Sequence, residues 1–338
     1  MERVPHQVTL IPGDGIGPEV SAAARRAVDA TGVKIDWHVT ELNPDVIAKT
    51  GQSVPAHVIE SIERTGVGLK APVTTPIGGG YTSVNVALRK RLDLFANVRP
   101  VRSLPGIATR FQDVKIDMVL FRENTEDLYS GLEHEVVKDV VTGLKVITRT
   151  ASMRIAEYAF YYAAVNNRRK VAAIHKANIM KLADGLFLRC CREVAMKYPQ
   201  LEYKELIVDN ASMQLVTKPE QFDVLLLPNL YGDILSDLAA GLVGGLGIVP
   251  GANMGEKHAV FEAVHGSAPD IAGKGIANPT AMMMSAVMML IHLREKTAAD
   301  KLQAAIEKIY ADGQHTTGDV GGKASTNEFT DAVIAAMG

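Results

Sequence analysis

The sequence predicts an α/β protein whose strands are at least partly parallel. In its N-terminal part, short apolar runs typical of buried strands alternate with segments of helical periodicity. Residues 8–11 read as a strand that runs into a glycine-rich turn at residues 12–18, and residues 19–30 then place Ala and Val at helical spacing. Strands are also expected at Val33–Val39 and Val67–Leu69, and a helix at Pro55–Thr65. This strand–helix alternation favours parallel pairing.

Later elements continue the pattern. Further strands, each followed by polar residues of the kind found in functional sites, are expected at Met118–Phe121, Val171–Ile174 and Asp223–Leu227. Helices are expected at Thr280–Leu293 and Ala298–Ala311. No repeat, low-complexity tract or flexible linker interrupts the sequence. A domain boundary must therefore fall in compact structure, and the chain can cross between two lobes more than once.

Length and composition exclude several classes of protein. A chain of 338 residues predicts about two domains, or one fold with two lobes. The apolar share of 47% and the charged share of 22% are ordinary for a soluble globular protein. With 36 Lys and Arg against 38 Asp and Glu, the net charge is −2, which argues against nucleic-acid binding. Cys190 and Cys191 are adjacent and are expected to be small buried thiols in a reducing compartment.

We expect a soluble, cytoplasmic protein that does not bind membranes. The N-terminal segment MERVPHQVTLIPGDG lacks the apolar stretch of a secretory signal. The most apolar uncharged stretches are residues 238–254 and 276–291. The first holds five glycines and a proline, and the second is interrupted by Asn278 and Pro279 and is too short for a membrane span.

The turn after the first strand resembles a dinucleotide-binding fingerprint only loosely. Gly13, Gly15 and Gly17 are spaced G-x-G-x-G, and Pro18 stands where the last glycine of G-x-G-x-x-G belongs. Proline in a first turn is a good start for a helix. A tight structural turn and a phosphate- or cofactor-binding loop explain the segment equally well, and a plain Rossmann enzyme is doubtful.

Residues 74–122 collect groups suited to an anionic substrate. The group consists of Ser83, Asn85, Arg89, Arg99 and Arg122, after three consecutive glycines at 78–80. Ser83 and Asn85 precede an expected helix, and Arg89 lies four residues after Asn85 on the same face. Arg99 follows an expected strand, and Arg122 ends another. Guanidinium groups bind carboxylates bidentately, so the set is suited to a substrate with several carboxylates, although solvated surface charges explain it equally well.

Three carboxylates are candidate metal ligands. Asp233 and Asp237 lie four residues apart in a segment where a helix is expected to begin near Asp233, so they share one helix face. Hard carboxylate oxygens suit Mg²⁺ or Mn²⁺. The alternative is an aspartate favoured by the positive end of a helix. Asp209, after a strand-like run, is a candidate third ligand.

Two residues are candidates for proton transfer, and one loop for cofactor binding. Lys176 follows an expected strand and Tyr129 lies in RENTEDLY, although both residue types are more often exposed or structural. The loop at residues 265–279, HGSAPDIAGKGIANP, places His265, Asp270 and Asn278 where they could bind an adenine and a ribose. An acidic residue at the ribose favours a 2′-hydroxyl over a 2′-phosphate, and hence NAD.

Six motifs together resemble one enzyme family. They are IPGDGIGPE, TTPIGGGYTSVNVALRKRLDLFANVRP, FRENTEDLYSG, HKANIMK, NLYGDILSDLAAGLVGGLG and HGSAPDIAGKGIANP. In this order they resemble the β-decarboxylating dehydrogenases, the isocitrate and 3-isopropylmalate dehydrogenase family, and the resemblance extends from about residue 8 to residue 322. It implies the family's own two-domain α/β fold with a mixed sheet, which is not a Rossmann fold.

The resemblance also implies a domain division and a dimer. Residues 1–94 and 244–338 would form the large, cofactor-binding domain, and residues 95–243 the small domain. A segment near residues 130–150 would pair the subunits of a homodimer. Two such dimers could also form a tetramer. The active sites would be shared, with Lys176 and Asp209 coming from the neighbouring subunit.

The resemblance assigns roles to the candidate residues. Tyr129 and Lys176 would be catalytic, and Ser83, Asn85, Arg89, Arg99 and Arg122 would bind the substrate. Asp209, Asp233 and Asp237 would hold Mg²⁺ or Mn²⁺. The cofactor residues would be Thr74, between substrate and nicotinamide, and His265, Gly266, Ala268, Asp270, Ile271 and Asn278.

Residue matches within the family indicate the reaction. Asp270, Ile271 and Gly322 stand where NADP-dependent isocitrate enzymes commonly carry Lys, Tyr and Arg, so NAD is expected. Ser83 and Asn85 are polar where isopropylmalate enzymes hold an alkyl group, so the expected substrate is isocitrate, oxidised and decarboxylated to 2-oxoglutarate and CO₂ as in the tricarboxylic acid cycle. The alternatives are a homoisocitrate or 3-isopropylmalate dehydrogenase, and a non-catalytic regulatory subunit of a hetero-oligomeric isocitrate dehydrogenase.

Overall fold

The computed structural model describes residues 4–75 and 82–338, so the three glycines at 78–80 lie outside the described residues. Its strands are β1 (His6–Ile11), β2 (Ile35–Val39), β3 (Val67–Lys70), β4 (Ala96–Arg102), β5 (Asp117–Glu123), β6 (Glu133–Val137), β7 (Val140–Gly143), β8 (Lys170–His175), β9 (Glu202–Ile207), β10 (Val224–Leu227), β11 (Pro250–Met254) and β12 (Ala259–Ala263). Its helices are α1 (Gly17–Ala30), α2 (Pro44–Thr50), α3 (Ala56–Thr65), α4 (Val84–Arg91), α5 (Arg149–Val165), α6 (Ala183–Ala195), α7 (Val208–Thr217), α8 (Asn229–Val243), α9 (Thr280–His292), α10 (Lys296–Asp312) and α11 (Thr326–Ala336).

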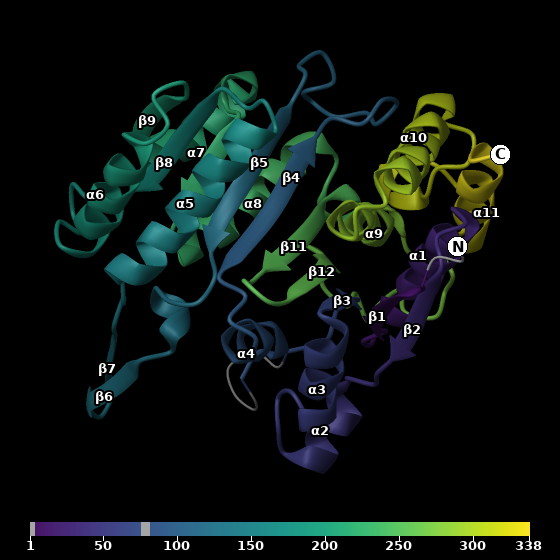
Figure 1. Cartoon of the computed structure of the whole chain (residues 1–338), viewed down its shortest axis with the longest axis horizontal. Coiled ribbons are helices and arrows are strands. Elements are labelled where there is room, and N and C mark those ends of the chain that lie inside the picture. The colour runs from purple at the N-terminus through teal and green to yellow at the C-terminus, as the bar shows by residue number, and fades with distance from the viewer. Residues whose placement is uncertain (1–3, 76–81) are drawn as a thin grey trace.

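Ten of the strands in the described part form one mixed sheet, in the order β2-β1-β3-β12-β11-β4-β5-β10-β8-β9 (Figure 1). The outer pairs are parallel, whereas β12–β11, β11–β4 and β4–β5 are antiparallel. The predicted α/β class with partly parallel strands is therefore confirmed. A Rossmann sheet is parallel and follows another order, so the expected departure from that fold is confirmed too.

Helices cover the two halves of this sheet. Near one end, α5 and α6 pack together, α7 packs on α8, and both α5 and α8 contact β5 and β10. Near the other end, α1, α9, α10 and α11 form one packed group, and α9 contacts β3, β11 and β12. A smaller apolar cluster joins α2, α3 and α4. The division into domains at residues 94 and 244 stays a prediction, because one sheet runs through both halves.

The expected elements are present with small shifts at their ends, and three expected positions are wrong. Arg99 lies inside β4 and does not follow a strand. Asn85 lies in the first turn of α4 and does not precede it. The helix that carries Asp233 begins at Asn229, one turn earlier than expected. Polar residues caused each error: Arg99 and Asn85 line a cavity instead of marking the end of an element, and Asn229 is buried as the first residue of α8.

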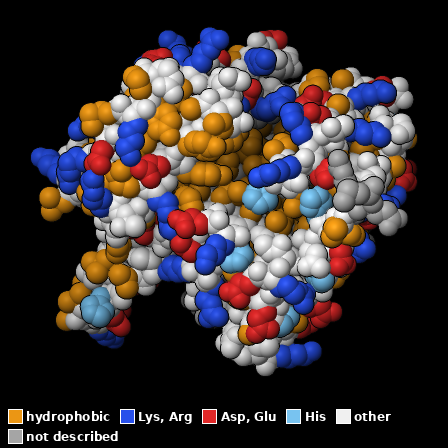
Figure 2. Space-filling view, in the orientation of Figure 1, with side chains coloured by type: hydrophobic (Ala, Val, Ile, Leu, Met, Phe, Trp, Pro, Cys, Tyr) orange, Lys and Arg blue, Asp and Glu red, His pale blue; other side chains and the backbone are white. Residues whose placement is uncertain are grey.

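The three central strands carry polar residues on one face and apolar residues on the other. Alternate positions of β4 place Asn97 and Arg99 on a charged cavity, and Val98 and Pro100 on an apolar one of about 310 Å³ between α5 and α9. Figure 2 shows apolar side chains gathered in a hollow near the middle of the face that it draws. The alternation is that of any β-strand, in which successive side chains point to opposite faces.

Three further features bear on the predictions. The hairpin β6–β7 projects from the body and is exposed along its whole length, and it lies in the segment expected to pair subunits. Cys190 and Cys191 are buried free thiols, as expected. No helix in the described ranges is long and apolar enough to cross a membrane.

Candidate active site

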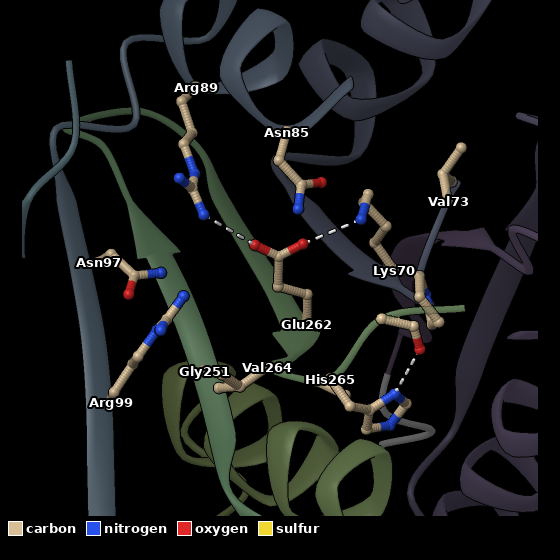
Figure 3. Close-up of a pocket in the computed structure, with 13 residues that line it drawn as sticks. Lys70, Val73, Asn85, Arg89, Asn97, Arg99, Gly251, Glu262, Val264 and His265 are labelled. Carbon is tan, nitrogen blue, oxygen red and sulfur yellow. Dashed lines mark hydrogen bonds and ion pairs between the residues drawn. The ribbon is translucent and has the colours of Figure 1, made fainter. Parts of the chain in front are cut away.

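A polar cavity of about 140 Å³ opens where β3, α4, β4, β11 and β12 meet. Figure 3 shows Asn85 and Arg89 reaching in from α4, Arg99 from β4, and Lys70 from the end of β3. Glu262 of β12 lies between the side chains of Arg89 and Lys70. Of the predicted site residues, Asn85, Arg89, Arg99, His265 and Gly266 line this cavity.

Glu262 is the electrostatic centre of the cavity. Its Oε2 accepts a hydrogen bond from Lys70 Nζ at 2.9 Å, and its Oε1 lies 3.4 Å from Arg89 Nη2. Burial by itself would raise the pKa of this carboxyl group, but the two cations outweigh burial and lower the pKa to about 2. The carboxylate is therefore charged at every physiological pH, and it holds both cations in place.

Asn253 of β11 connects the cavity to its surroundings. Its Oδ1 accepts hydrogen bonds from Arg89 Nε at 3.1 Å and from the amides of Asn97 and Asn124, each at 2.9 Å. Its Nδ2 donates to Glu262 Oε1 at 2.7 Å. Since Asn253 is buried, these bonds have little competition from water. The network fixes Arg89 and Glu262 relative to each other.

A second group of predicted residues lies beside the cavity, where Arg99 meets α8. Arg99 Nη1 contacts Asp237 Oδ1 at 3.2 Å, and Arg99 Nη2 lies 3.8 Å from Asp233 Oδ1. Arg122 Nη1 pairs with the same oxygen of Asp233, and Tyr129 Oη donates to the other. The Arg122 guanidinium also lies over the Tyr129 ring, with its carbon 4.8 Å from the ring centre. Four separate segments thus meet at Asp233.

The two aspartates differ in their electrostatics. Burial opposes ionisation of both, but Arg122, the Tyr129 hydroxyl and Arg99 lower the pKa of Asp233 below its ordinary value. For Asp237 burial is the larger effect, and its pKa is raised despite Arg99. Burial and the hydrogen bond to Asp233 raise the pKa of Tyr129, which keeps its phenol protonated near neutral pH.

The donor set on α8 fits a divalent metal in part. Asp233 and Asp237 lie on one helix face, as predicted, and present hard oxygen ligands. Asp209 does not join them: its Oδ1 accepts from Lys176 Nζ at 2.7 Å in a separate, exposed pair. Within the described residues of this one chain, no three His, Cys, Asp or Glu side chains group closely enough to hold a metal. A complete site requires a further ligand from outside the chain.

The glycine turn and the cofactor-candidate loop pack on each other. The amide of Thr74 donates to Asp14 Oδ1 at 2.9 Å, and its hydroxyl is 2.7 Å from that of Ser267. A Cβ at Gly15, whose φ is +59°, would lie 2.0 Å from the Ser267 carbonyl oxygen. Of the two interpretations of this turn, the contacts favour the tight structural one, because its glycines are needed for close packing against the loop.

The loop at residues 265–279 contains no helix or strand, as expected. Gly266 and Asp270 are exposed, Ile271 is half-buried, and Ala268 adopts a positive φ of 39°. His265 donates from Nδ1 to the Gly266 carbonyl, and burial lowers its pKa, so it is neutral at pH 7.

Two predicted residues have environments that the sequence did not suggest. The Asn278 side chain is buried, donates to the Tyr310 hydroxyl and Asp319 Oδ2, and accepts from the amide of Thr280. Its contacts are therefore internal, and its role in cofactor binding stays a prediction. Ser83 precedes α4, but its hydroxyl does not cap that helix.

Sequence reasoning missed four residues of the site: Lys70, Asn229, Asn253 and Glu262. A detectable signal existed for two of them. Lys70 ends the apolar strand β3 and Glu262 interrupts β12, and a charged residue in a buried strand almost always has a partner. Asn229 and Asn253 carried no such signal, because a single asparagine near a glycine or proline is common in turns.

The chain belongs to the isocitrate/isopropylmalate dehydrogenase family, whose sequence model matches residues 7–333. A similar solved structure is an isocitrate dehydrogenase from Methylococcus capsulatus, with a TM-score of 0.95, 47% identity, and coverage of 98% of this chain and 99% of that one.

Curated relatives span several activities. An Arabidopsis thaliana protein named mitochondrial NAD isocitrate dehydrogenase catalytic subunit 5 is 54% identical, over 97% of this chain and 88% of its own length. A Solanum tuberosum chloroplastic 3-isopropylmalate dehydrogenase is 55% identical, over 91% and 86%. A Dictyostelium discoideum protein, named as a mitochondrial regulatory subunit of NAD isocitrate dehydrogenase, is 51% identical, over 97% and 91%.

These relatives correct the predicted location. The expectation of a cytoplasmic protein is wrong on this comparison, because the Arabidopsis and Dictyostelium isocitrate dehydrogenase relatives are named as mitochondrial. That expectation rested on the lack of a secretory signal. A missing secretory signal does not distinguish the cytoplasm from an organelle that uses a different, removable import signal.

Proposed function

We propose that the chain catalyses the NAD-dependent oxidative decarboxylation of isocitrate to 2-oxoglutarate and CO₂, with a divalent metal. The charge of the site carries the proposal. Four buried cations, Lys70, Arg89, Arg99 and Arg122, meet three carboxylates, Glu262, Asp233 and Asp237, which leaves one net positive charge. A divalent cation would raise the total to three positive charges, which balances a tricarboxylate.

The polar residues of α4 favour isocitrate over 3-isopropylmalate. Asn85 lines the cavity beside Arg89, so the position nearest the helix offers an amide and a guanidinium. Those groups would bind a third carboxylate, and against an alkyl chain the Asn85 amide would lose that partner, which costs affinity. Homoisocitrate, which is one methylene longer, and 3-isopropylmalate remain the alternative substrates, and the Solanum tuberosum relative keeps the second of these open.

The arginines would bind the substrate and Tyr129 would supply a proton. Arg89, Arg99 and Arg122 would hold the substrate carboxylates, with Ser83 and Asn85 near the third one. After hydride leaves C2 and CO₂ leaves C3, the enolate carbon needs a proton, and Tyr129 is a neutral donor beside Arg122. NAD⁺ supplies the hydride acceptor.

Lys176 would act in the site of a second copy of the chain. Its ammonium group pairs with Asp209, whose side chain is 69% exposed, so both groups are open to another subunit. In a homodimer Lys176 would take the substrate's hydroxyl proton, and Asp209 would complete the metal ligands with the partner's Asp233 and Asp237. A divalent cation supplies Lewis acidity for the substrate hydroxyl and the developing enolate.

NAD would bind along the loop at residues 265–279, with Thr74 between the nicotinamide and the substrate. His265, Gly266, Ala268 and Ile271 would contact the cofactor, and Asp270 would accept from the ribose hydroxyls. The exposed carboxylate of Asp270 would repel a 2′-phosphate.

A second candidate is a regulatory role, because one relative bears that name. A regulatory chain would be expected to have lost some of the charged groups. The chain keeps all of them: Arg89, Arg99, Arg122, Tyr129, Lys176, Asp209, Asp233 and Asp237. Arg99, Arg122, Tyr129, Asp233 and Asp237 are linked by ion pairs and hydrogen bonds in one cluster, and such a charged cluster favours a catalytic role.

The test is NADH formation by the purified chain with Mg²⁺ and NAD⁺. Isocitrate, homoisocitrate and 3-isopropylmalate are offered in parallel, with NADP⁺ in place of NAD⁺ as the control. We expect isocitrate with NAD⁺ to give the dominant rate. A higher rate with another substrate would overturn the inference that Asn85 and Arg89 of α4 select isocitrate. If none of the three substrates yields NADH, the regulatory role would be favoured.

A further inference from the structure

One edge of the Arg122 guanidinium is held by a neutral side chain. Asn229, the first residue of α8, accepts with Oδ1 from Arg122 Nε at 2.9 Å and from Arg122 Nη2 at 2.7 Å. Arg122 is 1% exposed and Asn229 0%, so water does not compete for these bonds. Sheet register brings the two together, because Leu227 of β10 pairs with Arg122 of β5 and Asn229 follows two residues later.

The contacts of Arg122 leave part of it available. A guanidinium has five N–H groups in a fixed plane. Asn229 takes two of them and Asp233 a third, which leaves one N–H on each terminal nitrogen. Each of these two N–H groups is a charged donor that can bind a carboxylate oxygen. The face of the plane is fixed as well, by the Tyr129 ring.

The orientation of the Asn229 amide is determined by its other partner. Its Nδ2 donates to the carbonyl oxygen of Glu126 at 3.2 Å. A flipped amide would place its nitrogen against the Arg122 donors and its oxygen against that carbonyl, so both contacts would be repulsive. The acceptor atom of Asn229 must therefore face Arg122.

Gly232, one turn along α8, permits the close approach. A Cβ at this position would lie 2.5 Å from Arg122 Cγ and 2.6 Å from its Cβ. Any other residue would force the arginine stem away from the helix, and the guanidinium would move with it. Both Asn229 and Gly232 thus act on the same side chain, from the same face of α8.

We propose that Asn229, assisted by Gly232, is a positioning residue that aims Arg122 at a substrate carboxylate without neutralising its charge. This inference rests on the proposed function. Burial and the neighbouring cations Arg89 and Arg99 already disfavour the charge on Arg122. An aspartate at 229 would relieve that electrostatic cost but would cancel the net positive charge of the cavity. A neutral oxygen orients the guanidinium and keeps the charge for the substrate.

The first test is Asn229→Asp, with Asn327→Asp as the matched control. Asn327 is exposed on α11 and accepts from Arg26, so its variant adds the same charge next to an arginine far from the cavity. We expect Asn229→Asp to raise the KM and the calorimetric Kd for isocitrate at least about tenfold, while kcat and the Kd for NAD⁺ change less than about threefold. The control should leave all four values unchanged.

The second test, Gly232→Ala, changes the position of Arg122 without changing charge. It should raise the Kd for isocitrate and leave that for NAD⁺ unaltered, which a general loss of stability would not do. A folded variant of either kind that binds isocitrate as the wild type does would overturn the inference. If the wild-type chain itself neither binds nor oxidises isocitrate, the proposed function fails instead. If Asn229→Asp does not fold, Asn229→Ser and Gly232→Ala decide the question.

Discussion

Glu262→Gln is the change whose effect is best defined by the structure. It removes a carboxylate, 6% exposed, that lies 2.9 Å from Lys70 Nζ and 3.4 Å from Arg89 Nη2. The two cations lower the pKa of Glu262 from 4.5 to about 2, against the opposing effect of burial. A carboxyl group whose pKa is lowered by folding stabilises the folded state above its unfolded pKa, and loses that contribution as the pH falls through its folded pKa.

The size of the effect follows from that shift. A difference of about 2.5 pKa units corresponds to about 3 kcal/mol of unfolding free energy near neutral pH. At pH 3 the same two pKa values give a contribution of about 1.4 kcal/mol to the free energy of unfolding. The stability difference between wild type and Glu262→Gln should therefore be constant above about pH 5 and shrink steadily below it.

Urea unfolding of both proteins at several pH values between 3 and 7 measures this difference. Taking the difference removes the acid titration of all other carboxylates. Glu157→Gln is the control, because Glu157 forms an exposed pair with Lys197, which contributes little at any pH. Parallel stability curves for wild type and Glu262→Gln across this range would refute the argument that Glu262 is a charged, paired carboxylate.

Three further predictions concern catalysis, packing and metal binding. Lys176→Met should lower kcat at least about a hundredfold with an unchanged melting temperature, and near-normal NADH formation would exclude its role in proton transfer. Gly15→Ala should lower the melting temperature more than Gly273→Ala: both glycines have positive φ, but a Cβ at Gly15 meets a carbonyl oxygen at 2.0 Å and one at Gly273 meets nothing within 4 Å. Equal losses would show that strain in φ, and not the contact, dominates. Burial raises the pKa of Asp237, so on acidification this carboxylate is protonated at a higher pH than an ordinary aspartate. Protonation weakens metal binding, so the Mg²⁺ concentration that gives the half-maximal rate should begin to rise at that higher pH. An unchanged requirement between pH 7 and pH 5 would count against Asp237 as a ligand.

The outer parts of the fold were predictable and the centre was not. β10 is the apolar run VLLL, β8 has the apolar centre VAAI, and β1 is buried over VTLI, since parallel strands are buried on both faces. Of the central strands, β11 and β12 escaped prediction, and β4 was expected only as a strand that ends before Arg99. β4 reads ANVRPVR, and its two arginines and one proline suggest a loop to any argument from composition. Only the packing of its neighbours makes it a strand.

The arginines and aspartates of the candidate site could be predicted from the sequence. The asparagines that hydrogen-bond to these arginines could not. Arg89, Arg99 and Arg122 stand out as charges near strand ends and on a helix face, and family motifs carry them. Asn229 and Asn253 act by accepting hydrogen bonds from those arginines across long sequence separations. Such contacts depend on sheet register, which a sequence pattern does not contain.

Burial of the apolar face of the central strands determines the direction in which their polar side chains point. Val98, Ala252 and Phe261 lie side by side across β4, β11 and β12, in register, and each is at most 3% exposed. Burying this row determines which residues of the three strands point the other way: Asn97, Arg99, Asn253 and Glu262. A slip of one residue in β11 would turn Asn253 into the apolar face, and the acceptor for Arg89 and the amide partner of Glu262 would be lost together. The hydrophobic contribution of the row therefore sets the geometry of the charged cavity, although none of its members touches that cavity.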